Sequence, residues 1–400
     1  MAAVNAKARG ARTRIGFLFN HDQIHQIGHS LPVALALAAR RRPDIEVVLV
    51  TTSARLLDEV ERLIAAQGTR PPLTIAELRP RRWSSRLASA LLERWLPIAK
   101  LAIYRDNLPF FGSLDALVVA EKSSTLLKTR YGLHDLVLIH TRHGAGDRAI
   151  GFNPVSAAFD LVLVSGPKVR DRLMAEAGLG ADRLALVGYP KLDLLAAEPP
   201  RLPLQANGRP TVLYNPHVSP HLSSWYEDGL EVLEWFAANP AYNLIFAPHV
   251  MLFERPLAVT IDRLTARRPG RIPRRLLQAP NILVDLGSRA STDMTYTQAA
   301  DLYLGDVSSQ VYEFLERPRP CIFLDTHHVA WRDDPNYAYW HAGEVIGDMA
   351  ELPAALDRAW REHPRYLPAQ ERLFAASIER TDRPASERAA DAILARLGRR

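Results

Sequence analysis

The fold of this chain is decided by the stretch LYLGDVSSQVYEFLERPRPCIFLD, which occupies residues 302–325. A short apolar run comes first, a Gly-Asp turn and two serines follow, and a helical stretch then leads through prolines into a second apolar run. This order is typical of a βαβ unit, in which two parallel strands flank a helix. We predict strands at 302–305 and 321–325, with the intervening helix starting near Ser308.

Short apolar runs alternate with helical stretches over most of the chain, so the pattern predicts mainly parallel sheets and an α/β fold. The preceding sequence predicts ten further strands, at 14–20, 45–51, 73–77, 116–120, 136–141, 161–165, 184–188, 211–215, 243–247 and 281–285. Helical stretches separate most of them, as at 30–41 and 167–177.

The proline-rich segment EPPRLPLQANGRP, at 198–210, interrupts this alternation and is interpreted as a linker between domains. A chain of 400 residues suits two domains of roughly 150–200 residues each. We therefore predict two Rossmann-like domains, at 1–197 and 211–363, that face each other across a cleft. The amphipathic segment 364–400 is expected to form a helix that crosses back onto the first domain.

Composition excludes several classes of protein. The one cysteine, Cys321, lies in an apolar run, which predicts a buried thiol and no disulfide framework. No run reaches the roughly 20 apolar residues of a spanning helix, and the basic N-terminus lacks the apolar core of a secretory signal. We expect a cytoplasmic protein. The net charge of +6 favours anionic partners, but the basic residues are scattered and no nucleic-acid module occurs, so no nucleic-acid partner is expected.

One insertion departs from the strand and helix pattern. Residues 79–111 combine clustered arginines with aromatic residues, among them Trp83, Trp95 and Tyr104. A basic amphipathic helix with aromatics can lie on an anionic membrane surface, which would make the protein peripheral to the membrane. The alternative is an ordinary helix whose aromatic side chains pack on the core.

Ligands of open α/β sheets bind beyond the carboxyl ends of the strands, so polar residues at those ends are the candidates for a site. The segment LVLIHTRHGAGDRAIGF, at 136–152, places His143 and Gly144 directly after a predicted strand. An imidazole with its usual pKa near 6.5 suits a general base at neutral pH, and we predict this role for His143. The alternative is a histidine that caps the sheet edge.

The stretch that opens this section supplies a second candidate site. Gly305 ends a predicted strand, and Asp306, Ser308 and Ser309 are expected to cap the next helix, whose free N–H groups would bind phosphate. Glu313 lies one turn beyond Ser309 and is a candidate for holding ribose hydroxyls. Plain helix capping without a ligand is the alternative.

Three further strand ends carry histidines. His249 follows one strand, and Asn215 and His217 follow another; either imidazole could donate to a diphosphate oxygen. The first strand leads into HDQIHQIGH, and we predict a substrate loop there with His29 nearest the next helix. Since no cysteine or HExxH pattern accompanies these histidines, we expect no metal site.

These clusters, in this order, resemble the CDP-glycerol glycerophosphotransferase family, the teichoic-acid polymerases, which have a GT-B fold. The N-terminal IGHSLPVALALAARRRPDIEVVLVTT looks like the opening of nucleotide-sugar GT-B enzymes and of UDP-N-acetylglucosamine 2-epimerases. The family's T-x-HGT, G-x-PR-x-D, post-strand histidine and D-Y-S-S motifs match Thr141–Ala145, Gly188–Asp193, His249 and Asp306–Ser309, within a match that covers roughly 136–356.

The resemblance implies that His143 deprotonates an acceptor hydroxyl. From their places after the strands, we expect His29 and Gly144 on the acceptor side. It further implies that His249, Ser308 and Ser309 hold the donor phosphates and Glu313 the ribose. Ala145 and Val250 replace the family's threonine and proline, and LYNPHVS matches the family's YAPTWR strand only loosely, which leaves the identity of the donor open.

The prediction is therefore a transferase without metal or cofactor that moves glycerol phosphate, or a sugar, from a nucleotide-activated donor such as CDP-glycerol. The acceptor would be a cell-envelope polysaccharide or a lipid-linked molecule, bound by the first domain, while the second binds the donor. Three alternatives stay open: an isomerase similar to the 2-epimerases, a GT-B glycosyltransferase with another donor, and a binding protein without turnover.

Overall fold

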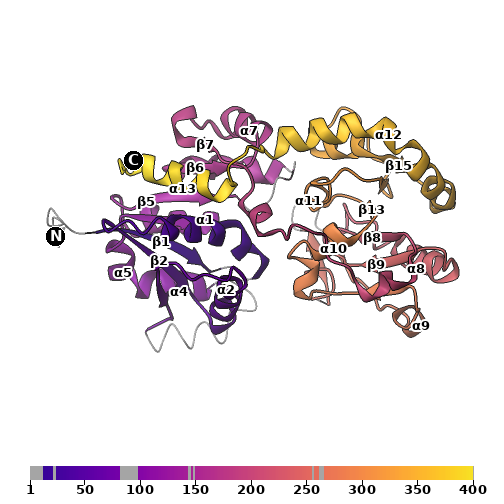
Figure 1. The fold of residues 1–400 in the computed structure, drawn as a ribbon, viewed down its shortest axis with the longest axis horizontal. Coiled ribbons are helices and arrows are strands. Elements are labelled where there is room, and N and C mark those ends of the chain that lie inside the picture. Colours follow the sequence, from indigo (N-terminus) through magenta and orange to yellow (C-terminus); the bar gives the residue numbers. More distant parts are fainter. Residues whose placement is uncertain are drawn as a thin grey trace. The chain divides into compact units, whose positions relative to one another are not determined.

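The computed structural model describes residues 12–20, 24–81, 98–142, 146, 149–254, 256–260 and 265–399. The chain forms two compact units, and each contains an α/β sheet (Figure 1). One unit consists of Met1–His143, Phe152–Leu194 and Glu379–Arg400, and the other of Gly144–Gly151 and Leu195–Ile378. The predicted α/β class is confirmed.

Across its described ranges, the first unit has a seven-stranded parallel sheet in the order β3-β2-β1-β4-β5-β6-β7. All seven predicted strands are found, with ends that shift by up to two residues. Their bounds are β1 Thr13–Phe19, β2 Ile45–Thr51, β3 Thr74–Glu77, β4 Ala116–Val119, β5 Val137–Thr141, β6 Leu161–Val164 and β7 Leu184–Leu186.

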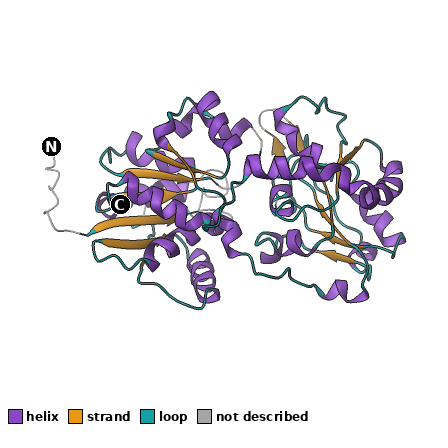
Figure 2. Cartoon of the chain, turned by 45° about the horizontal axis from the view of Figure 1, so that its top comes forward, coloured by secondary structure: helices purple, strands orange, loops and turns teal. Residues whose placement is uncertain are grey.

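Both faces of this sheet are buried, because side chains alternate along each strand. On β1, Phe17 and Phe19 point to one apolar layer and Leu18 to the other. Helices cover both layers, as Figure 2 shows for the strands in orange. The helices of this unit are α1 Ile27–Ala39, α2 Ala54–Ala66, α4 Ile98–Asp106, α5 Leu108–Gly112, α6 Leu126–Thr129, α7 Pro167–Ala177 and α13 Ala385–Arg396. Its short 3-10 turns are η1 Ile24–Gln26, η2 Lys122–Thr125, η4 Pro154–Ala158, η5 Ala181–Arg183 and η6 Pro190–Leu194.

The second unit repeats this architecture with a six-stranded parallel sheet, in the order β12-β9-β8-β13-β14-β15 among the residues described. Five of the strands were predicted. The sixth, β15, has only three residues and begins with Glu344, which forms an ion pair with Arg358, so it lacks the apolar run that marks the others. The bounds are β8 Thr211–Asn215, β9 Asn243–Phe246, β12 Ile282–Val284, β13 Leu302–Gly305, β14 Cys321–Leu324 and β15 Glu344–Ile346, with an antiparallel hairpin of β10 Ala258–Thr260 and β11 Thr265–Arg267.

Helices of the second unit differ from the sequence prediction at one important point. The longest of them begins at Leu352 and passes through Pro364, where the prediction placed the start of the last segment. Trp360, Pro364 and Pro368 follow one exposed face, so water can solvate the carbonyls that lose their N–H partners. The bounds are α8 Gly229–Ala238, α9 Arg274–Leu277, α10 Thr295–Ala299, α11 Val311–Phe314 and α12 Leu352–Ser377, with 3-10 turns η3 Ala149–Phe152, η7 Pro203–Asn207, η9 Arg289–Ser291, η10 Pro335–Ala342 and η11 Met349–Glu351.

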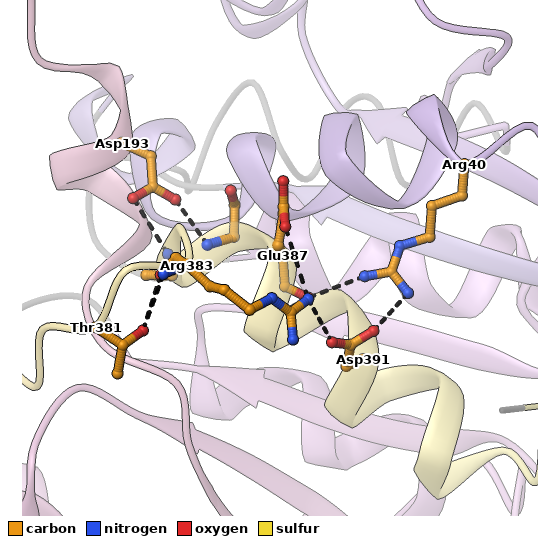
Figure 3. Close-up of polar contacts among 8 residues, drawn as sticks. Arg40, Asp193, Thr381, Arg383, Glu387 and Asp391 are labelled. Carbon is orange, nitrogen blue, oxygen red and sulfur yellow. Dashed lines mark hydrogen bonds and ion pairs between the residues drawn. The ribbon is translucent and has the colours of Figure 1, made fainter.

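The C-terminal helix α13 returns to the first unit and packs beside α1 (Figure 1). Polar contacts fix its start, as Figure 3 shows: the Asp193 carboxylate accepts the N–H groups of Ala385 and Ser386 at 3.2 and 2.7 Å. Farther along, Asp391 accepts from Arg40 at 2.6 Å. A carboxylate at a helix N-terminus satisfies free N–H groups and interacts favourably with the helix dipole.

The GYPKLD segment at 188–193 therefore helps to hold the C-terminal helix α13 against the first unit. Gly188 has φ of 87°, and a Cβ there would lie 2.7 Å from the backbone oxygen of Glu379. Only glycine combines that conformation with so close an approach. The motif that resembles a family signature is explained here by packing of the C-terminal segment.

The predicted insertion at 79–111 lies partly outside the described residues, since Trp83 and Trp95 fall in the range 82–97. In the described part, Tyr104 on α4 and Phe111 on α5 are fully buried, so their rings pack on the core. The interpretation as an ordinary helix holds for these two aromatics. None of the described helices is both long and apolar enough to span a membrane.

Candidate functional site

The second sheet reverses its strand order between β8 and β13. Strand β9 lies on one side of β8 and β14 on the far side of β13, so the connections leave in opposite directions. A crevice forms at such a point, beyond the carboxyl ends of the strands. Asn215 and Gly305 are paired at those ends, and the donor-site residues predicted from the sequence follow them directly.

Asp306 organises the loop that follows β8. Its carboxylate is 1% exposed and accepts the N–H groups of His217 at 2.9 Å, Ser224 at 2.6 Å and Val307, as well as the Ser224 hydroxyl at 2.9 Å. Burial raises the pKa of Asp306 to about 6, although these hydrogen bonds oppose the rise. The side chain holds the loop that contains His217 rather than capping a helix.

Asn215 links three strand ends through its amide. Its Nδ2 donates to the Ala247 carbonyl at 2.6 Å, and its Oδ1 accepts the Ser308 hydroxyl at 2.6 Å. Both residues are buried, with exposed fractions of 1% and 5%. Because the Ser308 hydroxyl already donates to Asn215, a bound phosphate would meet its oxygen or a backbone N–H.

The predicted helix start at Ser308 is wrong. The helix α11 begins at Val311 and has four residues, and its N-cap is Gln310, whose side chain makes no capping bond. Asp306 holds the β8 loop, and the Ser308 hydroxyl donates to Asn215 while it accepts the N–H of Gln310, the residue before α11, at 3.4 Å. So short a helix has little dipole, which removes the helix-terminus argument for phosphate binding here.

Two other residues predicted for the donor site, Ser309 and Glu313, follow Ser308 in the sequence. Ser309 is exposed, and Gly146 lies against it, because a Cβ at Gly146 would be 2.9 Å from the Cβ of Ser309. Gly146 and Ser309 belong to the same unit and are therefore neighbours within it. Glu313, on α11, is only 6% exposed, so its carboxylate is mostly covered by protein.

His217 and His249 form a pair at this sheet edge, with ring centroids 5.8 Å apart. Each ring uses Nδ1 as an acceptor, from Ser219 N–H at 3.0 Å and from Met251 N–H at 3.3 Å. In the neutral imidazole the proton is then on Nε2, which is left as the donor. Burial lowers the pKa of His249 to about 4, so this ring is neutral at pH 7.

The predicted residues of the first unit are placed only in part. His143 and Gly144 lie outside the described residues. His29 is described and corrects the prediction of a loop: it is the third residue of α1, is 4% exposed, and its ring lies 5.3 Å from that of Tyr189. The helix α1 begins at Ile27, earlier than predicted, because packing of its buried apolar residues stabilises the first turn. Pro32 has no N–H to donate within the helix, yet the helix continues through it.

The structure brings together residues that the sequence predicted for a donor site and that lie far apart along the chain. Asn215, His217, His249, Asp306 and Ser308 all meet at the carboxyl ends of β8, β9 and β13. Ser224 and Trp340 were not predicted, yet Ser224 binds the Asp306 carboxylate and Trp340 Nε1 donates to the Asp306 carbonyl at 2.8 Å. Neither has a local sequence signal: Ser224 lies in the segment after β8, and Trp340 lies in η10. Among described side chains, no group of three or more His, Cys, Asp or Glu residues is arranged to hold a metal ion.

Solved structures share this architecture along nearly the whole chain. The wall teichoic acid polymerase TagF has a TM-score of 0.60 at 11% identity, over 97% of this chain and 89% of its own. A UDP-N-acetylglucosamine 2-epimerase has a TM-score of 0.59 at 12% identity, over 98% and 97%. The S. aureus MnaA structure with UDP has a TM-score of 0.59 at 13% identity, over 97% and 98%.

This likeness confirms the GT-B fold, with two Rossmann-like units and a C-terminal helix that returns to the first. No family model matches the chain. No curated protein matches it either.

Proposed function

We propose that this chain is a transferase that binds a nucleotide-activated donor at the β8–β13 edge of its second unit. The supporting observation is the histidine pair His217 and His249, each held through Nδ1 at the strand-order reversal of the sheet. The group transferred is glycerol phosphate, as in CDP-glycerol, or a sugar. The acceptor is a polysaccharide or a lipid-linked molecule of the cell envelope.

The histidine pair suits stabilisation of a leaving nucleotide. Breaking the bond to the donor leaves negative charge on a phosphate oxygen, and a neutral His249 offers it an Nε2–H donor without first taking up a proton. The surrounding burial that lowers its pKa also strengthens such a bond, because little water competes for it. Approach of the anion favours the protonated ring, so the imidazole can donate more strongly as charge develops.

The acceptor chemistry requires a base, and we assign it to His143. In the sequence this residue follows β5, which ends at Thr141 in the first unit. The proposal includes neither a metal ion nor a cofactor. The proposed reaction takes place on the cytoplasmic side of the membrane. The segment 79–111 is the proposed contact with anionic lipid, and binding of the protein to anionic vesicles tests it.

The experiment compares donors and variants in the full-length protein. Thermal shift with CDP-, UDP-, GDP- and CMP-linked donors identifies a ligand, because binding to the native state raises the melting temperature by mass action. His249→Gln is expected to weaken donor binding by about tenfold, the loss of one hydrogen bond to a charged group. His143→Ala is expected to retain donor binding and lose transfer.

Two results would contradict this proposal. One is a His143→Ala enzyme with full turnover, and the other is donor binding that does not change in His249→Gln. His341→Gln serves as the matched control, because its ring is exposed and contacts the carbonyl of Arg332 and the ring of Trp331 rather than the histidine pair. Tight donor binding without turnover on any acceptor would favour a binding protein.

The main alternative is an isomerase, since the 2-epimerase structures match the chain over as much of its length as TagF does. Epimerisation at C2 of a nucleotide sugar exchanges a carbon-bound hydrogen with solvent. Incubation of the protein with UDP-N-acetylglucosamine in deuterated water distinguishes the two functions. Deuterium at C2 identifies the isomerase, and an unlabelled sugar supports the transferase.

A further inference from the structure

A hollow of about 430 Å³ opens at the amino edge of the first sheet. The end of α1 and the starts of β2 and β3 bound it, and they supply Leu37, Ile45 and Thr74 to its lining. This edge is opposite to the carboxyl edge, where the ligands of open α/β sheets usually bind. The hollow shares no residue with the proposed donor site, and its volume lies within the range of small-molecule sites.

Arginines are concentrated at this hollow. The segments 12–14 and 40–42, which border it, contain five of them. Three are held in ion pairs: Arg14 with Glu46 at 2.9 Å, Arg42 with Asp44 at 2.9 Å and, as Figure 3 shows, Arg40 with Asp391 at 2.6 Å. The other two, Arg12 and Arg41, are exposed, and their side chains form no hydrogen bond or ion pair with another described residue. Both of these arginines line the hollow.

The carboxylates nearest to the hollow are already engaged. Asp44 accepts Nε and Nη2 of Arg42 at 3.1 and 2.9 Å. Glu46 lines the hollow, but its carboxylate accepts Nε of Arg14 at 2.9 Å. A carboxylate that is paired with one guanidinium in this way has its charge compensated. An anion in the hollow would therefore give Arg12 and Arg41 charge-assisted hydrogen bonds that the described protein groups do not supply.

The backbone of Arg41 also departs from the usual pattern of a helix end. Helix α1 ends at Ala39, and Arg41 follows with φ of 49° while its N–H donates to the Ala38 carbonyl at 3.1 Å. Glycine is the common residue in this left-handed position, because a Cβ strains the conformation. Arg40 and Arg42 already provide cations for the carbonyl end of the helix. A strained arginine without a partner is better explained by a ligand than by the stability of the helix.

Apolar side chains form most of the remaining lining. Leu37, Ile45 and Leu73 line the hollow together with Pro43 and Pro72. Ile45 and Leu73 are only half-buried, so part of their surface is available to a ligand. An inorganic ion would leave this surface exposed to water, whereas a ligand with an apolar body would cover it. The lining therefore fits a molecule with an anionic end and an apolar body.

We propose that this hollow is a binding site for a small amphiphilic oxyanion, a phosphate or carboxylate group on an apolar body. Arg12 and Arg41 bind the oxyanion, and Ile45 and Leu73 contact the apolar body. The ligand is bound without being transformed, because the lining contains no histidine or cysteine and its one carboxylate is paired with Arg14. This inference goes beyond the proposed transferase function and does not depend on it.

The test measures binding of 1-naphthyl phosphate to the full-length protein by calorimetry. Two comparison ligands separate the two parts of the site, because 1-naphthol lacks the charge and inorganic phosphate lacks the apolar body. We expect 1-naphthyl phosphate to bind about tenfold more tightly than either, since only this ester makes both the charge-assisted hydrogen bonds and the apolar contacts.

Three variants locate the binding. Arg12→Gln and Arg41→Gln are each expected to weaken binding of 1-naphthyl phosphate by about tenfold, the loss of a charge-assisted hydrogen bond. Arg41→Gly is expected to weaken it as much and to unfold at no lower temperature than the wild type, because glycine adopts φ of 49° without strain. Arg170→Gln is the matched control, because this exposed arginine of α7 pairs with Asp171 outside the hollow.

Several results would overturn the proposal. If the three variants bind the ester as the wild type does, another part of the chain is responsible. If 1-naphthol binds as tightly as the ester, the hollow is merely an apolar surface, and if inorganic phosphate does so, it is an unspecific anion site. Self-association that is lost in Arg41→Gly, without binding of the ester, would mean that an acidic surface of a second copy occupies the hollow instead.

Discussion

His249 offers the sharpest physical test of the donor site. Burial lowers its pKa to about 4 from the usual 6.5, so the folded protein binds this proton more weakly than the unfolded chain does. Between pH 6.5 and 4 the unfolded state therefore takes up more protons, and acid favours unfolding. The stability that His249 contributes is present above pH 6.5 and is lost as the pH falls toward 4.

The magnitude follows from the size of the shift. Each pKa unit corresponds to about 1.4 kcal/mol, so lowering the pH from 6.5 to 5 costs about 2 kcal/mol of the free energy of unfolding. Solvent screening of this partly exposed ring reduces the cost to about 1–2 kcal/mol. His249→Gln lacks this titration, so the difference in stability between wild type and variant is expected to change by that amount between pH 7 and pH 5.

Urea unfolding followed by tryptophan fluorescence, at pH 5 and at pH 7, measures this difference. Comparing wild type with variant at each pH removes the contributions of groups that both proteins share. Nitrogen-15 NMR of the imidazole provides a second measurement, because it reports both the pKa and the proton on Nε2 that the Met251 N–H bond requires. His341→Gln is expected to leave the pH dependence within about 0.5 kcal/mol of the wild type, as exposed substitutions do.

A His249 resonance that titrates at pH 6 or above would refute this reasoning. It would mean that water reaches the ring freely and that the proposed neutral donor is charged in part of the population. The same conclusion follows if the stability difference between wild type and His249→Gln is constant from pH 7 to pH 5. Protonation on Nδ1 in the neutral ring would separately contradict the described hydrogen bond.

Four more predictions concern the contacts that hold the site and the C-terminal helix. Burial raises the pKa of Asp306 to about 6, so the stability that its protonated form contributes to the folded protein is lost as the pH rises through 6. Asp306→Asn should remove this pH dependence of the free energy of unfolding, measured by urea unfolding. Asp193→Ala should lower the stability of the first unit by about 1 kcal/mol in the same assay, because it removes a helix cap. Gly188→Ala should lower it by more than about 2 kcal/mol, because alanine is strained at the φ of 87° that Gly188 adopts. Gly146→Ala should lower turnover about tenfold by displacing Ser309, as measured by release of the nucleotide from the donor.

Much of the fold was predictable from the sequence, because parallel strands that are buried on both faces consist of short apolar runs. Residues 302–305 and 321–325 illustrate this, since both are found as strands at nearly the predicted bounds. The strand β15 was missed because three residues with a glutamate at the start carry no such signal. The order of the strands within each sheet was also beyond the sequence, because pairing depends on contacts between distant segments.

The candidate site shows the same division. The sequence by itself determined that polar side chains and histidines follow the strands, because a strand end is a local signal. Only the tertiary structure decided what they do: Asp306 and Ser308 look like helix caps in the sequence, yet they hold the β8 loop and Asn215.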